Sequence, residues 1–212
     1  RLIALENTHN YCMGSPIKPG YMQQAGNLAK RYNLQIHVDG ARIFNAAEAL
    51  EVDVKDLVKE ADSVMFCLSK GLSAPVGSLV CGNKKFINRA RKWRKMVGGG
   101  MRQSGHLAAA GIIALNELVN KLKKDHINAQ VLAQGLARLN GIVLDQELIK
   151  TNIIFFSLKH PTLEPGIFLE KLEVQGIKIL EIQPGVFRAV LHRDVSESQI
   201  ERVIRVSEEI TR

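Results

Sequence analysis

The sequence has little aromatic content and no apolar run long enough to cross a membrane. Aromatic residues make up 5% of the 212 residues, with one tryptophan. No apolar stretch approaches the roughly 20 residues that a membrane-spanning helix requires. The net charge of +8 favours anionic ligands. However, no RNA-binding or helix-turn-helix signature accompanies that charge, so we expect neither a membrane nor a nucleic acid as partner.

Cysteine is also scarce, which bears on the redox environment. The three cysteines, Cys12, Cys67 and Cys81, are widely spaced and form no Cys-x-x-Cys pair. Cys67 and Cys81 lie in apolar segments, so we expect free, buried thiols rather than disulfides. Free thiols are typical of a reducing compartment, here the cytoplasm or the mitochondrial matrix. The chain begins at Arg1 inside an apolar segment, and we interpret this N-terminus as cut.

The first half of the chain alternates between strand-like and helix-like segments. Short apolar runs bounded by turn residues predict strands, and apolar residues at helical spacing predict helices. The predicted strands cover residues 2–5, 34–38, 63–68 and 78–81, and the predicted helices residues 21–32, 41–50 and 54–61. This alternation is typical of a parallel sheet with crossover helices.

The second half changes character after a long helical stretch. A basic helix over residues 84–95 leads to Gly98–Gly100, then to an alanine-rich helix over residues 106–124 that continues to about residue 139. The following strands are predicted at residues 142–144, 153–157, 177–180 and 187–191, and the helices at 167–174 and 196–211. Ser196 and Gln199 form a capping-box pattern at the start of the last helix. We therefore predict a first domain over residues 1–122 and a smaller α+β domain over residues 123–212.

Two charged residues follow successive predicted strands. Asp39 ends one strand, and Lys70 comes directly after the next. Ligands of open α/β sheets bind outside the carboxyl ends of the strands. An amine and a carboxylate there suit pyridoxal phosphate, with the lysine bonding the aldehyde and the aspartate pairing with the ring nitrogen. The alternative is a buried Asp–Lys ion pair. His37 and Asp39 share a strand face without a third ligand, so we expect no metal.

Five motifs give this pattern a family context. They are residues 5–10 (LENTHN), 37–46 (HVDGARIFNA), 68–78 (LSKGLSAPVGS), 94–103 (RKMVGGGMRQ) and 188–196 (RAVLHRDVS). In order and spacing they resemble the low-specificity threonine aldolases, fold-type I pyridoxal-phosphate enzymes related to aspartate aminotransferase. The resemblance implies an α/β fold of the aspartate aminotransferase type. Residues 1–122 would then be the C-terminal part of the cofactor-binding large domain, and residues 123–212 the small domain.

The resemblance also assigns roles to individual residues. Lys70 matches the lysine that forms the Schiff base, and Asp39 matches the aspartate beneath the pyridine nitrogen. Arg42 falls where the family has a cation beside the phenolic oxygen of the cofactor. Arg188 matches the arginine that binds the α-carboxylate of the substrate, a task that suits its planar guanidinium.

The remaining assignments have plain structural alternatives. Lys95 and Arg102 match cations that reach the cofactor phosphate from a neighbouring subunit, but Lys95 also belongs to an ordinary solvated helix face. Ser69 has the position of a phosphate hydrogen-bond donor. His9 lies in a loop bordering the site and is a candidate for substrate binding. The family implies a homodimer or homotetramer with sites between subunits.

The resemblance begins partway through the family. The Gly-rich turn that cradles the phosphate and the histidine that stacks on the ring have no counterpart here. The implied reaction is cleavage of threonine or allo-threonine to glycine and acetaldehyde, possible also for other β-hydroxy amino acids. Two alternatives stay open: another fold-type I lyase or racemase, and an inactive remnant of such an enzyme.

Overall fold

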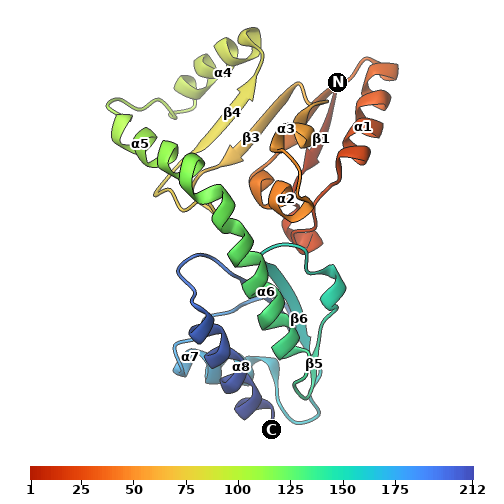
Figure 1. The fold of residues 1–212 in the computed structure, drawn as a ribbon, viewed down its shortest axis with the longest axis vertical. Coiled ribbons are helices and arrows are strands. Elements are labelled where there is room, and N and C mark those ends of the chain that lie inside the picture. Colours follow the sequence, from red (N-terminus) through yellow and green to blue (C-terminus); the bar gives the residue numbers. More distant parts are fainter. The chain divides into compact units, whose positions relative to one another are not determined.

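The computed structural model describes all residues, 1–212, and divides them into two compact units (Figure 1). The first unit consists of Arg1–His9 and Pro16–Leu122. The second consists of Asn10–Ser15 and Lys123–Arg212. Each unit has its own four-stranded sheet.

The sheet of the first unit has the strand order β1-β2-β3-β4. Its strands are β1 (Leu2–Glu6), β2 (Gln35–Asp39), β3 (Ser63–Cys67) and β4 (Ser78–Gly82). The first three are parallel and β4 is antiparallel to β3. The crossovers are α1 (Pro19–Tyr32), α2 (Ile43–Leu50) and α3 (Val54–Val58). The predicted βαβ pattern is therefore confirmed for β1 to β3.

Local signals set the ends of α1. Pro19 occupies the first turn, where its missing N–H costs no helical hydrogen bond. The helix ends at Asn33, which adopts a left-handed conformation with φ of 51° and donates its N–H to the carbonyl oxygens of Ala29 and Lys30. Met22 and Ala29 are buried and pack with Ile36 and Val38 of β2.

After the sheet, the chain of the first unit becomes helical. The helix α4 (Lys84–Met96) has no buried residue, and α5 (Gly105–Ile113) buries only Gly111. A π-helical turn over Ala114–Leu118 and a 3-10 turn over Val119–Lys121 connect α5 to α6 (Leu122–Leu136). The long helix predicted over residues 106–124 is thus a helical path with two changes of pitch.

The second unit is an α+β arrangement. Its antiparallel sheet has the order β5-β6-β8-β7. The strands are β5 (Ile142–Val143), β6 (Ile153–Leu158), β7 (Leu180–Gln183) and β8 (Val186–Val190), and the later helices are α7 (Pro165–Val174) and α8 (Glu197–Thr211). Phe187 lies at the centre of the core, with ring centroids 5.3 Å from Phe156 and 5.6 Å from Phe168.

One predicted strand is misplaced. The expected strand over residues 177–180 begins only at Leu180. Ile177 instead donates its N–H to the carbonyl oxygen of Leu172 at the end of α7, and its side chain is buried in the core. The apolar residue after the helix thus closes the helix end and does not pair with a strand.

Two further expectations meet different outcomes. The capping box is confirmed: Ser196 Oγ accepts from the N–H of Gln199 at 3.3 Å, and Gln199 Oε1 accepts from the N–H of Ser196 at 2.7 Å.

All three cysteines are free, but the expectation that Cys81 is buried is wrong. Cys81 is exposed because β4 is an edge strand with every residue exposed. No helix is both long and apolar enough to cross a membrane.

Candidate cofactor site at the carboxyl ends of β2 and β3

Asp39 is the last residue of β2, and three hydrogen bonds hold it and the following residue, Gly40. Its carbonyl oxygen accepts a hydrogen bond from the N–H of Asn7, with 2.8 Å between N and O. Its Oδ1 atom accepts from the N–H of Ala41 at 3.0 Å. The next residue, Gly40, donates its N–H to the carbonyl oxygen of Met65 on β3 at 2.8 Å. The carboxylate therefore has a defined orientation at the strand end.

Arg42 carries a cation into the same region. The residue is half-buried and precedes α2. Burial lowers the pKa of its guanidinium, while the charges of Glu6, Cys67 and Asp39 act in the opposite direction. Glu6, Asp39 and Cys67 are the last residues of β1, β2 and β3, so Arg42 lies near the carboxyl ends of all three strands. Arginine remains protonated throughout the physiological range, so the strand ends hold a fixed positive charge.

Lys70 follows β3 in a loop whose neighbours are anchored. Leu68, Leu72 and Ala74 are buried, and the N–H of Ser73 donates to the carbonyl oxygen of Lys70 at 2.8 Å. Ser69 and Lys70 are themselves exposed. Apolar packing therefore holds the backbone of the loop in place, while the amine of Lys70 and the hydroxyl of Ser69 lie at the surface.

The loop after β1 borders this region. Asn7 is fully buried, and its side chain both donates to the carbonyl oxygen of Ile17 at 3.1 Å and accepts from the N–H of Ile17 at 3.0 Å. His9 Nε2 lies 3.3 Å from Glu6 Oε2. Thr8 is fully buried, and its hydroxyl has no hydrogen-bond partner.

Three further predicted site residues lie on other elements. Lys95 lies in the last turn of α4, Arg102 lies between α4 and α5, and both are exposed. Arg188 is half-buried on β8 of the second unit, where it pairs in register with Phe155 of β6 and Leu180 of β7.

Comparison with known proteins identifies the family. The family model described as "Beta-eliminating lyase" matches residues 1–159. The chain belongs to the beta-eliminating lyase family. Within curated proteins, it is 44% identical over 201 residues to low-specificity L-threonine aldolase 1 of Arabidopsis thaliana. It is 42% identical over 203 residues to the low specificity L-threonine aldolase of Escherichia coli strain K12.

The two alignments cover nearly all of this chain but little more than half of each relative. They include 94% and 96% of this chain and 56% and 58% of the two relatives, so the chain spans about half the length of the relatives that it matches. Among solved structures, the threonine aldolase of Leishmania major has a TM-score of 0.81 at 20% identity, over 100% of this chain and 61% of that protein. A Sphingomonas wittichii serine palmitoyltransferase has a TM-score of 0.74 at 22% identity, over 99% of this chain and 54% of that protein. The predicted fold is confirmed.

The residues of this beta-eliminating lyase family member fit one end of pyridoxal phosphate. An exposed amine on Lys70, an oriented carboxylate on Asp39 and a cation on Arg42 are the groups that an aldehyde, a pyridine nitrogen and a phenolic oxygen require. The buried hydroxyl of Thr8 adds a polar atom with spare hydrogen-bonding capacity. The phosphate end is less complete: of the two serines in the Lys70 loop, Ser73 donates its hydroxyl to the carbonyl oxygen of Gly71, which leaves Ser69 as the phosphate donor.

Sequence reasoning placed the loop of Asn7, Thr8 and His9 at the border of the site but missed Glu6. Glu6 pairs in register with Asp39 and acts electrostatically on Arg42. This relation depends on the parallel pairing of β1 and β2, so sequence spacing alone could not reveal it. Glu6 does belong to the LENTHN motif, which was the available signal. No group of three His, Cys, Asp or Glu side chains is placed to hold a metal, and His37 Nδ1 instead lies 2.8 Å from Ser63 Oγ.

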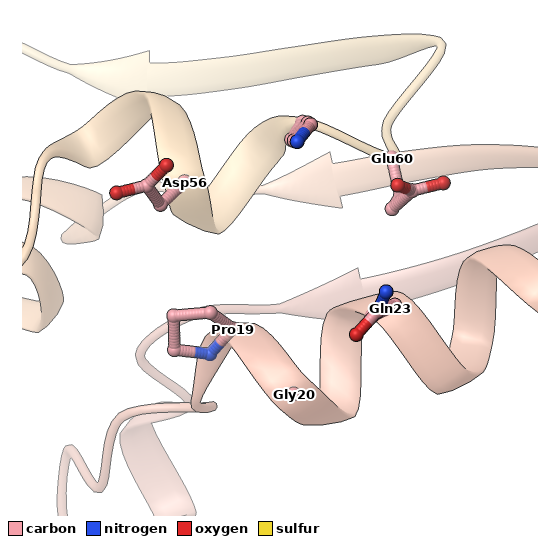
Figure 2. A pocket seen from close by; sticks show the side chains of 6 residues that line it. Pro19, Gly20, Gln23, Asp56 and Glu60 are labelled. Carbon is pink, nitrogen blue, oxygen red and sulfur yellow. The ribbon is translucent and has the colours of Figure 1, made fainter.

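A separate polar groove lies between α1 and α3 (Figure 2). It is lined by Pro19, Gly20, Gln23, Asp56, Lys59 and Glu60. None of these belongs to the candidate site. Glu60 at one end is engaged by Lys30, with 2.7 Å between Oε2 and Nζ.

Proposed function

We propose that this chain carries the lysine- and ring-binding part of a pyridoxal-phosphate-dependent threonine aldolase. The observation that supports the proposal is the placement of Asp39 and Lys70 at the carboxyl ends of adjacent parallel strands, with the charge of Asp39 acting on Arg42. The similarity of 42–44% to low-specificity L-threonine aldolases points to the substrate class. The reaction is cleavage of threonine or allo-threonine to glycine and acetaldehyde.

Each residue has a distinct task in this proposal. When bound, pyridoxal phosphate supplies an electron sink for the negative charge that develops on the α-carbon as the Cα–Cβ bond breaks. Lys70 Nζ holds the aldehyde carbon of the cofactor. The Asp39 carboxylate keeps a proton on the pyridine nitrogen, and the N–H of Ala41 keeps that carboxylate in place. Arg42 stabilises the phenolic oxygen by its charge.

The outer parts of the site complete the assignment. Ser69 donates to the phosphate, and Lys95 and Arg102 supply positive charge to it from a neighbouring copy in a homodimer or homotetramer. The guanidinium of Arg188 binds the substrate carboxylate in a bidentate manner. His9, held near Glu6, borders the substrate. The free thiols suit the reducing compartment predicted above.

The test is reconstitution with pyridoxal phosphate, borohydride reduction and peptide mass mapping. We expect a reduced adduct on Lys70 that disappears in Lys70→Ala, whereas Lys84→Ala, which removes an exposed lysine of α4, retains it. Labelling spread over surface lysines would contradict the assignment.

A product assay then separates the alternative activities. Release of acetaldehyde and glycine from threonine supports an aldolase. An inverted α-carbon without cleavage indicates a racemase. An adduct on Lys70 without turnover of any substrate indicates an inactive remnant.

A further inference from the structure

Thr151 and Asn152 form a buried polar pair that directly precedes β6 in the second unit. The two residues are 0% and 4% exposed. Burying a polar side chain costs free energy unless that side chain is hydrogen-bonded, so its partners show which parts of the chain it holds. Each of the two side chains donates a hydrogen bond to a backbone carbonyl oxygen of a segment that is distant in sequence.

Asn152 fastens the end of β8, the strand that carries Arg188. Its Nδ2 atom donates to the carbonyl oxygen of Leu191 at 2.8 Å, and its own carbonyl oxygen accepts from the N–H of Leu191 at 2.9 Å. The side chain thus takes the role that a main-chain N–H has in a regular antiparallel pair. Three residues further along, Phe155 of β6 pairs with Arg188. The bonds of Asn152 therefore fix the register in which β8 presents Arg188.

Thr151 fastens a segment that continues from His9. Its hydroxyl donates to the carbonyl oxygen of Gly14 at 3.0 Å. Gly14 has a φ of +67°, and a Cβ atom on it would overlap Thr151 Oγ1, so this approach requires glycine. The side chain of Asn7 binds both the N–H and the carbonyl oxygen of Ile17. His9 therefore lies in a loop that is held at its base and near its tip.

We propose that Thr151 and Asn152 are positioning residues for substrate binding, with Asn152 setting the place of Arg188 and Thr151 that of His9. The inference rests on the proposed function, which assigns the substrate carboxylate to Arg188 and the border of the substrate to His9. A bidentate pair needs two parallel N–H···O bonds, so a small displacement of the guanidinium weakens it. Neither Thr151 nor Asn152 touches the substrate.

A purely stabilising role fits this pair less well. The core around β6 and β8 is otherwise apolar, with Ile154, Phe156 and Phe187 buried in it. Apolar side chains in place of the pair would fill the same space without the cost of desolvating polar groups. Buried polar groups with all their partners present specify one arrangement of the segments that they join. Here both of those segments carry or continue from a residue assigned to the substrate.

The first experiment observes Arg188 directly in the full chain without cofactor. The Nε atom of Arg188 is buried, so its N–H should give a resolved signal in proton–nitrogen NMR, identified by its loss in Arg188→Lys. Asn152→Asp keeps the side-chain shape but turns the donor into a carboxylate that faces the carbonyl oxygen of Leu191. We expect the Arg188 signal to shift or broaden in this variant. Leu172→Ala, a core change on α7 that lowers stability, should leave the signal in place.

The second experiment measures threonine cleavage by the cofactor-loaded protein. Asn152→Asp should raise the KM for threonine by about tenfold with a smaller change in kcat, because it weakens a contact made equally in the ground and transition states. Thr151→Val, which removes only the hydroxyl, should raise the KM by roughly threefold. Thr151→Ser should restore the wild-type KM, and Leu172→Ala should retain it. The borohydride adduct on Lys70 should form in all of these variants.

The outcomes separate this inference from the proposed function. If the wild-type protein forms no adduct on Lys70, the proposed function fails, and the NMR signal alone decides whether Asn152 positions Arg188. An unchanged Arg188 signal in Asn152→Asp would overturn the inference at any level of activity. An equal rise in KM in Leu172→Ala would also overturn it, because general loss of stability would then explain the effect.

Thr151 keeps the inference testable if Asn152→Asp does not fold. The ring signals of His9 should then shift in Thr151→Val and return to their wild-type positions in Thr151→Ser. Ring signals of His9 that are identical in the two Thr151 variants would overturn the inference.

Discussion

The backbone N–H of Gly40 donates a hydrogen bond to the carbonyl oxygen of Met65, with 2.8 Å between the two atoms. This bond joins the residue after Asp39 to the middle of β3, the strand that leads to Lys70. A Cβ atom on residue 40 would lie 2.8 Å from the same oxygen. The close approach of the end of β2 to the middle of β3 therefore requires glycine at this position.

Gly40→Ala should destabilise the protein by about 1–3 kcal/mol, because the added methyl group forces the end of β2 away from the middle of β3. Urea denaturation followed by circular dichroism measures the change in the free energy of unfolding. Gly105→Ala is the control, since nothing lies within 4 Å of a Cβ at that position. Equal stabilities of the two variants would show that β2 and β3 tolerate the wider spacing.

Asp39→Asn tests the electrostatic role of the carboxylate. The amide oxygen can still accept the hydrogen bond from Ala41, so the turn should keep its geometry. The loss of negative charge beside the pyridine nitrogen should reduce turnover by about 100-fold or more, while the borohydride adduct on Lys70 still forms. Asp56→Asn, on the exposed side of α3, should have wild-type turnover. Full activity of Asp39→Asn would remove Asp39 from the site.

Arg188→Lys tests recognition of the substrate carboxylate. Lysine keeps the charge but loses the two parallel N–H donors of the guanidinium. The KM for threonine should rise by roughly tenfold or more with a smaller change in kcat, since a charge-assisted hydrogen bond contributes about 1.5–3 kcal/mol. Arg205→Lys, exposed on α8, should leave KM unchanged. A fall in kcat alone would place Arg188 outside carboxylate binding.

Asp125 and His126, adjacent and buried on α6, should give the stability of the protein opposing pH dependences. Burial raises the pKa of Asp125 from 3.8 to about 6, against the lowering effect of His192 and Arg193. Burial lowers the pKa of His126 from 6.5 to about 4. Between pH 4 and 6 the folded Asp125 keeps a proton that the unfolded chain has lost, so its contribution to stability falls as pH rises. The unfolded His126 binds a proton that the folded state excludes, so its contribution rises with pH.

In the wild-type protein, the pH dependences that Asp125 and His126 give to the free energy of unfolding therefore offset each other. Asp125→Asn should leave a free energy of unfolding that increases by about 3 kcal/mol from pH 4 to 6.5, and His126→Gln one that decreases by a similar amount. Urea denaturation at pH 4, 5, 6 and 7 measures both. His106→Gln, exposed on α5, serves as the control. If the free energy of unfolding changed with pH in the same direction in both variants, the opposite effects of burial on Asp125 and His126 would be contradicted.

Local patterns in the sequence predicted most elements of the fold. The turn before α1, the capping box of Ser196 and the alternation of strands and helices depend on neighbouring residues. The strand predicted at residues 177–180 is wrong in its start. Ile177 closes the end of α7 by donating its N–H to the carbonyl oxygen of Leu172, and the apolar pattern alone did not reveal this contact. The exposure of Cys81 likewise depends on its place at the edge of a sheet.

By itself, the sequence determined the chemical groups available to this protein and their order along the chain: a carboxylate at Asp39, a cation at Arg42 and an amine at Lys70, each beside a strand end. Only the tertiary structure decided which of these meet. Parallel pairing brings Glu6 beside Asp39, and the Gly40–Met65 hydrogen bond joins the end of β2 to the middle of β3, two residues that lie 25 positions apart in sequence. The tertiary structure also decided that β4 lies at an edge of the sheet with every residue exposed. Register and burial arise from contacts between distant segments, which no local pattern of residues encodes.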